Sequence, residues 1–268
     1  MKAEALALVG EETNPSRILN ILREYLQVLA LRSLHESEAF SNLAFVGGTA
    51  LRFSHGLLRF SEDLDFSLET LTGYLPERWL KKLKTDLMLA GYDITLSWSD
   101  KTDVHKSWIK YGELLKEAGL SPHSEQKLSI KLEIDTRPPH GAVCNRRIIT
   151  RHRLLSLQLY DLPSLMAGKI HALISRGYPK GRDWYDLLWY RGRRPPVEPN
   201  LTQLQNALDQ THGKGAFHAS DWKARCLERA QEIDIAKLVL DVHPFLEHPE
   251  EAAMLTFDNI RSVLLDEV

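Results

Sequence analysis

Hydrophobic spacing near the start of the chain predicts one long amphipathic helix. Between residues 16 and 36, apolar side chains recur every three or four positions. They are Ile18, Ile21, Leu22, Tyr25 and Leu29. This interval matches the turn of an α-helix with one buried side. A second helix is expected over residues 76–91, with Pro76 in its first turn and Gly91 as its stop.

Between and after these helices, the pattern changes to one typical of strands. Residues 42–48 form a short apolar run that ends in two glycines, which indicates a buried strand entering a turn. Residues 61–69 alternate, with Leu64, Phe66 and Leu68 on one side of the chain. Alternation also predicts strands over 93–99 and 127–137, and a further strand region over 146–159.

Helical spacing returns at Asp161 and continues to the end. Asp161 is a plausible N-cap, Pro163 fits the first turn and Gly177 the stop of a helix, and residues 181–192 predict another. A proline-rich break follows, and then further helices. We therefore expect an α/β domain over residues 1–155 and a helical domain over residues 156–268 that completes the active site.

Composition narrows the class of protein only a little. The 268 residues are 43% hydrophobic and 26% charged, with a net charge of −2, as in ordinary globular proteins. Two cysteines, Cys144 and Cys226, are too few for a disulfide framework and lack zinc-site spacing. No apolar run is long enough to span a membrane and no signal peptide is evident, so we expect a cytoplasmic protein.

Charge is distributed unevenly along the chain. Residues 140–195 contain eleven Arg and Lys against three Asp, a local net charge of +8. A basic zone on an otherwise acidic protein is typical of one face that binds nucleic acid or polyphosphate.

The most informative short motif combines two glycines with two aspartates. Gly47 and Gly48 permit a backbone that approaches an anion closely, and Thr49 adds a hydroxyl donor. On a strand, Asp63 and Asp65 share a face, where a divalent cation such as Mg²⁺ would offset their repulsion. Taken alone, the same pair could be the exposed face of an ordinary strand.

Three further groups of charged residues could complete a nucleotide site. The strand at 127–137 places Lys131, Glu133, Asp135 and Arg137 on one side, which suits either a third carboxylate or a solvated face. Lys169 and Arg176 lie two helical turns apart and suit a triphosphate. Asp183 and Asp186 share a helix face, where they could also simply complement the helix dipole.

Taken in order, four segments resemble a known family. They are FVGGTALRF…RFSEDLDFSL, KLEIDTR, GKIHALISR and KGRDWYDLLWY, within about residues 40–190. The chain resembles the AbiEii/MenT nucleotidyltransferase toxins of bacterial type IV toxin–antitoxin systems. The resemblance implies a DNA polymerase β-like α/β (α+β) domain with a helical C-terminal domain. It also implies Mg²⁺- or Mn²⁺-dependent transfer of a nucleoside monophosphate from an NTP to RNA, at the tRNA 3′ end, which blocks translation.

The same resemblance assigns roles to individual positions. Gly47, Gly48, Thr49 and Ser61 would contact the triphosphate, while Asp63 and Asp65 hold the metal. Glu133 is the expected third carboxylate and metal ligand, with Asp135 as a competitor because relatives commonly have Asn there. Lys169 and Arg176 would bind the phosphates, and Asp183 would orient Lys169 or meet the nucleotide. An antitoxin from a neighbouring gene is implied as a partner, not necessarily in a direct complex.

Two alternative functions remain open from the sequence. The enzyme could modify a hydroxyl of a protein or a small molecule instead of RNA. The chain could also be a non-catalytic module that binds NTP or RNA. Neither alternative involves a membrane.

Overall fold

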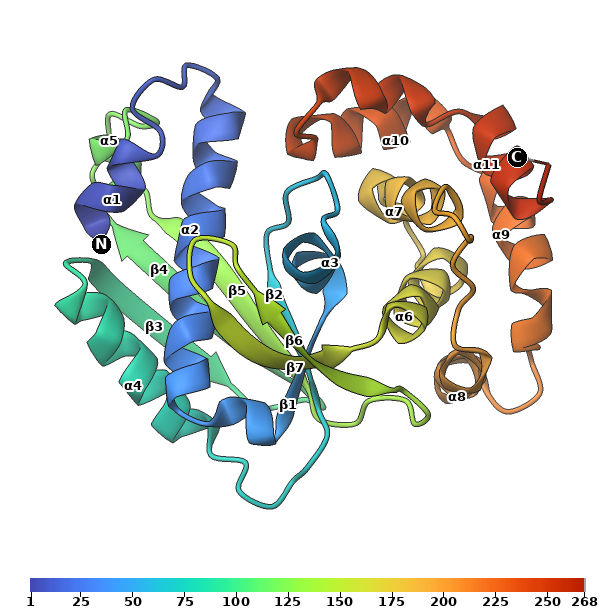
Figure 1. Ribbon diagram of the computed structural model, residues 1–268, viewed down its shortest axis with the longest axis horizontal. Helices are drawn as coiled ribbons and strands as arrows, with labels where there is room; N and C mark the ends of the chain where they lie inside the picture. Colours follow the sequence, from blue (N-terminus) through green and yellow to red (C-terminus); the bar gives the residue numbers. More distant parts are fainter. Residues whose placement is uncertain (268) are drawn as a thin grey trace. The chain divides into compact units, whose positions relative to one another are not determined.

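The computed structural model describes residues 1–267 and divides the chain into two compact units (Figure 1). The first unit contains residues 1–56, 60–138 and 145–159. The second contains residues 57–59, 139–144 and the chain from residue 160 onward. Two short segments that precede residue 160 therefore belong to the second unit.

A seven-stranded mixed sheet forms the centre of the first unit, in the order β3-β4-β5-β2-β1-β7-β6. Its strands are β1 (Leu43–Val46), β2 (Leu64–Leu68), β3 (Asp93–Ser99), β4 (Val104–Gly112), β5 (Leu128–Asp135), β6 (Cys144–Ile149) and β7 (Leu155–Tyr160). β2 is antiparallel to β1 but parallel to β5, and β4 is antiparallel to both β3 and β5. The parallel pair joins segments that are far apart in the sequence.

The first unit also contains helices. They are α1 (Lys2–Ala7), α2 (Pro15–Glu36), α3 (Gly47–His55), α4 (Pro76–Leu89) and α5 (Leu114–Glu117). The long α2 begins at its N-cap Asn14, whose side chain accepts hydrogen bonds from the Ser16 and Arg17 amides. α2 packs on α4, and both cover strands of the sheet. The predicted helices over 16–36 and 76–91 are confirmed.

The strand predictions were incomplete. β4 was not predicted, because its helix-facing positions include His105 and Ser107, which hide the alternation of apolar side chains. The single strand region expected over 146–159 consists of two strands, β6 and β7, separated by residues 150–154. His152 in that connection adopts a positive φ of 54°, typical of a tight turn.

Helices alone build most of the second unit. They are α6 (Leu162–Ser175), α7 (Gly181–Arg191), α8 (Leu201–His212), α9 (Trp222–Gln231), α10 (Ile235–Val242) and α11 (Phe257–Leu264). The predicted N-cap Asp161 is confirmed, because its side chain accepts from the Ser164 amide at 2.9 Å. α6 packs against α7, α8 and α9, while α7 also packs against α10 and α11. Within residues 161–267, the named elements are all helices, and the domain bounds 1–155 and 156–268 stay a prediction.

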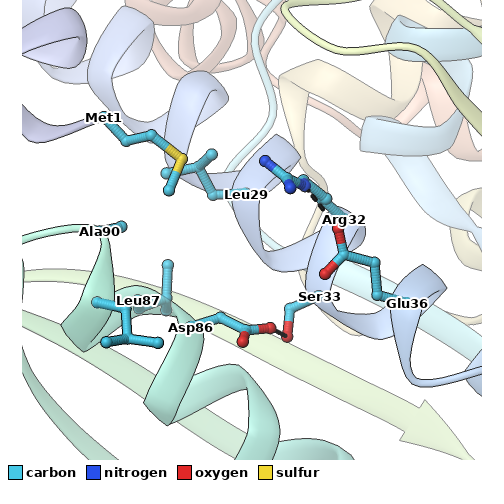
Figure 2. A pocket seen from close by; sticks show the side chains of 9 residues that line it. Met1, Leu29, Arg32, Ser33, Glu36, Asp86, Leu87 and Ala90 are labelled. Atoms are coloured by element: carbon cyan, nitrogen blue, oxygen red, sulfur yellow. Dashed lines mark hydrogen bonds and ion pairs between the residues drawn. The ribbon is translucent and has the colours of Figure 1, made fainter.

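A shallow hollow of about 180 Å³ lies between α2 and α4 (Figure 2). On its polar side, the Ser33 hydroxyl donates a 2.6 Å hydrogen bond to Asp86. The exposed Leu89 contributes to its apolar side. None of the predicted site residues lines it, so the candidate chemistry lies elsewhere. No helix within residues 1–267 is long and apolar enough to cross a membrane.

Candidate active site

The register of the parallel strands brings two predicted carboxylates together. Asp65 on β2 lies directly opposite Glu133 on β5, and their neighbours Leu64 and Leu132 are also opposite each other. The leucines are buried in the core, so Asp65 and Glu133 share the other face of the sheet. Asp63 immediately precedes β2, and the alternation along the chain puts it on the same face as Asp65. Strand pairing thus places Asp65 beside Glu133, and Asp63 lies two positions before Asp65 along the chain.

Two lysines lie beside the carboxylates. Lys131 Nζ is 2.8 Å from one Glu133 oxygen, and Lys106 Nζ is 3.6 Å from the other. Burial alone would lower the pKa of Lys131, but the hydrogen bond to Glu133 and the charges of Glu133, Asp63 and Asp65 raise it above its usual value. Lys131 is therefore held as a cation among the carboxylates.

Asp135, the predicted competitor of Glu133, is engaged differently. It lies opposite Ser67, two pairs further along the strands than Asp65 and Glu133. Its Oδ1 accepts a hydrogen bond from the Arg137 amide at 2.9 Å, which closes the turn after β5. Burial raises the pKa of this carboxyl above its usual value, and the charge of Asp103 adds to the effect. The local contacts give Asp135 a role in the turn and leave Glu133 facing Asp65.

Gly47 and Gly48 form the first turn of helix α3, directly after β1. Gly47 has a φ of +78°, which side-chain-bearing residues rarely adopt. A Cβ added to Gly47 would lie 2.3 Å from Asp65 Oδ2. The N-cap Val46 makes no side-chain cap for this helix, so backbone amides define its N-terminus. Gly47 is therefore required for its backbone conformation and for the approach of the Asp65 carboxylate.

Side chains from two helices fix the segment that carries Asp63. Thr49 is fully buried, and its hydroxyl donates to the Asp63 carbonyl at 2.5 Å. Gln27 of α2 is 1% exposed, and its amide nitrogen donates to the carbonyls of Ser61 at 3.0 Å and Glu62 at 2.9 Å. Three successive carbonyl groups are thus held in place. Gln27 was missed by sequence reasoning, because its only signal is a polar residue on the apolar side of an amphipathic helix.

The chemistry of these donors fits a hard divalent cation. Carboxylate oxygens are the ligands that Mg²⁺ and Mn²⁺ favour, and Mg²⁺ commonly takes one or two of them together with substrate phosphates. Within residues 1–267, no three His, Cys, Asp or Glu side chains converge closely enough to form a protein-only metal cage. Asp63 and Asp65 together with nucleotide phosphates would match this pattern.

The second unit contains its own buried charged cluster. Lys169 Nζ on α6 is 2.8 Å from Asp183 Oδ1 and 2.8 Å from Asp186 Oδ2, both on α7. Burial would raise the pKa of Asp183, but Lys169 and Arg176 outweigh it and lower the pKa to about 2. Burial would likewise lower the pKa of Lys169, but the two aspartates raise it. Asp183 and Lys169 are therefore both charged at neutral pH.

Two arginines complete this cluster. Arg176, the C-cap of α6, pairs with Asp183, as expected for a residue two turns after Lys169. Arg59 was not predicted: its Nε and Nη2 donate to the two oxygens of Asp186, each at 2.6 Å, and both side chains are almost fully buried. Arg59 joins the second unit by a β-bridge to Leu246. Its sequence signal was weak, because it lies in a short loop next to the glycine–aspartate motif.

Gly181 explains how α7 positions its aspartates. A Cβ added to Gly181 would lie 1.9 Å from the backbone oxygen of Leu238 in α10. Only glycine permits this approach, which fixes the first turn of α7, where Asp183 lies.

The basic zone predicted over 140–195 is divided between the two units. Arg151 and Arg153 belong to the first unit, where they pair with Glu24 and Glu4. Arg191 belongs to the second, is 3% exposed and pairs with Glu198 and Asp266. Local acids thus neutralise several of these cations, and the linear cluster does not correspond to one uninterrupted basic face.

Known proteins resemble this chain in sequence and in fold. The family model described as nucleotidyl transferase AbiEii toxin, type IV TA system, matches residues 29–260. A search of curated protein sequences found no significant match. Among solved structures, MenT4, a nucleotidyltransferase toxin from Mycobacterium tuberculosis H37Rv, has a TM-score of 0.56 at 16% identity and covers 100% of this chain and 90% of its own.

Two structures from Helicobacter pylori are also similar. A putative nucleotidyltransferase has a TM-score of 0.56 at 19% identity, covering 92% of this chain and 95% of its own. JHP933 has a TM-score of 0.52 at 19% identity, covering 91% of each chain. These likenesses confirm the predicted nucleotidyltransferase-type α/β fold, and the family match extends over most of the sequence. The chain belongs to the AbiEii family of nucleotidyl transferase toxins of type IV toxin–antitoxin systems.

Proposed function

We propose that this toxin transfers a nucleoside monophosphate from an NTP to the 3′ end of an RNA, with tRNA as the acceptor. The acceptor hydroxyl oxygen bonds to the α-phosphorus, the bond from that phosphorus to the β-phosphate oxygen breaks, and pyrophosphate leaves. The hydroxyl proton passes to a base. Blocking the tRNA 3′ end would stop aminoacylation and hence translation in the cytoplasm.

The observation that carries the proposal is the pairing of β2 with β5. It places Asp65 opposite Glu133, next to the glycine turn that opens α3. Asp63 and Asp65 would hold Mg²⁺ or Mn²⁺, with Glu133 as a further ligand. The ion would neutralise phosphate charge and help to activate the attacking oxygen. Glu133 would also help to activate the acceptor hydroxyl by accepting its proton.

The remaining predicted residues receive roles in binding the nucleotide. The amides of Gly47 and Gly48 at the N-terminus of α3 suit phosphate oxygens. Ser61 and Thr49 remain candidate contacts of the triphosphate, although the Thr49 hydroxyl also holds the Asp63 carbonyl. In the helical unit, Lys169 and Arg176 would supply positive charge for the phosphates, and Asp183 orients both.

The decisive experiment incubates the purified protein with each of four α-³²P-labelled NTPs, Mg²⁺ and total RNA. We expect label in the tRNA fraction with the wild type and none with Asp63→Asn, which should also no longer inhibit growth. Label in protein or a small molecule instead of RNA would support transfer to another acceptor. NTP binding without a labelled product would identify a non-catalytic module. Retained toxicity in Asp63→Asn would contradict the proposed role of this carboxylate.

A partner from the neighbouring gene is part of the proposal. Type IV systems include an antitoxin, so co-expression of the adjacent gene should restore growth whether or not the two proteins form a complex. Size-exclusion chromatography of the co-expressed pair distinguishes these two modes of action.

A further inference from the structure

Strands β3, β4 and β5 form one end of the sheet in the first unit (Figure 1), and on the face that carries the carboxylates their side chains are exposed on β3 and β4 and half-buried on β5. On these strands, the side chains of one face pack under the helices and those of the other alternate toward solvent. The solvent-facing positions of β3 and of the middle of β4 are exposed: Asp93, Thr95, Ser97, Ser99, Lys106, Trp108 and Lys110. A sheet face without helical cover is a surface available to a partner.

Cross-strand pairing arranges this surface in three rows. Glu133 lies opposite Lys106, Lys131 lies opposite Trp108, and Ser129 lies opposite Lys110. Because paired residues share a face, the three lysines surround the indole, and the first row ends at Glu133 and Asp65. On β4 and β5, these three rows contain three lysines and one glutamate, so their local charge is positive.

Trp108 is 42% exposed, although a large aromatic side chain is usually buried. Lys131 Nζ lies over its ring, 5.8 Å from the centroid, so a cation already stands beside the exposed indole. An exposed aromatic face among cations is the arrangement by which proteins bind single-stranded nucleic acid, with a base stacked on the ring and phosphates near the lysines. A protein partner would instead favour a broader apolar surface.

We propose that the open face of β3, β4 and β5 binds a single-stranded RNA end, with one base stacked on Trp108 and backbone phosphates near Lys106 and Lys110. Since the first row of this face ends at Glu133, the terminal hydroxyl would arrive beside the carboxylates. The inference rests on the proposed function for the identity of the RNA as the acceptor.

The test measures binding without NTP, so that it does not depend on catalysis. The probe is a fluorescein-labelled single-stranded oligoribonucleotide of about eight nucleotides, followed by anisotropy at several salt concentrations. Trp108→Ala should weaken binding about tenfold or more, because stacking on an aromatic side chain contributes on that scale. Trp108→Phe, which keeps a ring, should bind nearly as well as the wild type.

The lysines are tested by the salt dependence of binding. The double variant Lys106→Ala/Lys110→Ala should lower the slope of log affinity against log salt by about 1.4, or about 0.7 for each lost phosphate contact. Lys81→Ala/Lys84→Ala on α4 is the matched control, because both of these lysines are exposed on the helix that packs against the sheet. This control should leave the slope unchanged.

The outcomes separate this inference from the proposed function. Equal binding by Trp108→Ala and the wild type, or equal affinity for duplex RNA, would overturn the inference. Normal labelling of RNA by Trp108→Ala would also overturn it and leave the proposed function intact. Binding that depends on Trp108 in a protein that labels no RNA would support the surface and contradict the proposed function. If RNA does not bind, and the antitoxin no longer restores growth in cells that make Trp108→Ala, the face binds a protein partner and the inference is wrong.

Discussion

The carboxylate of Asp65 occupies the space in which a side chain on Gly47 would begin, with Oδ2 2.3 Å from the ideal Cβ position. The glycine at the end of β1 and the aspartate of β2 are therefore matched in shape. Val46, which precedes Gly47, pairs directly with Asp65 across the two strands. The phosphate-binding turn and the metal-binding strand of the proposed site consequently depend on each other.

Gly47→Ala tests this dependence. The substitution forces a left-handed backbone on alanine, which costs about 1–2 kcal/mol, and also displaces the Asp65 carboxylate. We expect toxicity and nucleotide transfer to be lost. Gly56→Ala is the control, because Gly56 has a φ of +71° and its added Cβ would meet nothing within 4 Å. Urea unfolding should show a similar backbone cost for both variants, so equal loss of transfer in Gly56→Ala would contradict the argument.

Glu133 and Asp135 can be separated by isosteric substitutions. Glu133→Gln should lower kcat about 10²-fold or more, the usual contribution of a positioned general base. Asp135→Asn should keep most of the activity, because an amide oxygen can still accept the bond from the Arg137 amide. Steady-state kinetics with saturating NTP measures both. The reverse order of effects would assign the third carboxylate to Asp135.

Gln27 should act on the site from a distance. In Gln27→Leu, the carbonyls of Ser61 and Glu62 lose their donor, so the unfolding free energy should fall by about 1–3 kcal/mol. The loop before β2 would also move, and we expect transfer to fall at least tenfold with a higher Mg²⁺ requirement. Ser33→Ala is the control, because it removes a hydrogen bond from a buried serine of the same helix but touches no site residue. If Ser33→Ala lowers transfer equally, the effect is general destabilisation.

Lys169 should contribute mainly to nucleotide transfer, and Arg59 mainly to the stability of the fold. Lys169→Met leaves Asp183 paired with Arg176 and Asp186 paired with Arg59, so we expect a folded protein that has lost transfer. Arg59→Met removes both bonds of a buried bidentate pair, and stability should fall by about 3–5 kcal/mol. Thermal unfolding together with the labelled-NTP assay checks both. Full transfer by Lys169→Met would remove this lysine from the proposed phosphate contacts.

A buried carboxylate in the first unit should make stability depend on pH. Burial would raise the pKa of Glu24, but His152, Arg52 and Arg151 outweigh it and lower the pKa to about 2. Because the folded pKa lies below the ordinary 4.5, the stabilisation is fully present above pH 4.5 and is lost as the pH falls toward 2. At pH 7, it amounts to about 3 kcal/mol.

Glu24→Gln checks this prediction. The difference in unfolding free energy between the wild type and this variant should be large at pH 7 and shrink steadily between pH 4.5 and 2. Glu125→Gln, in an exposed loop, should show little difference throughout. A constant difference for Glu24→Gln over this range would contradict the depressed pKa.

The sequence predicted the parts of the fold that depend on local signals. The capping residue Asp161 predicted the start of α6. The alternation around Asp65 and Glu133 predicted β2 and β5. The long-range pairs escaped prediction. Arg59 meets Asp186 across 127 positions, and Gln27 meets Ser61 across 34. No periodic pattern encodes such partners, because they follow from how separate elements pack and not from the turn or pleat of one element.

The parallel pairing of β2 with β5 also has a consequence for how the toxin is made. The chain emerges from the ribosome N-terminus first, so the glycine turn and both aspartates are complete well before residues 128–135 have been synthesised. Until that later segment arrives, β2 has no partner on that side, and both Glu133 and Lys131 are missing. A stalled or truncated chain that ends before β5 therefore carries the glycine–aspartate motif but lacks the third carboxylate of the proposed site.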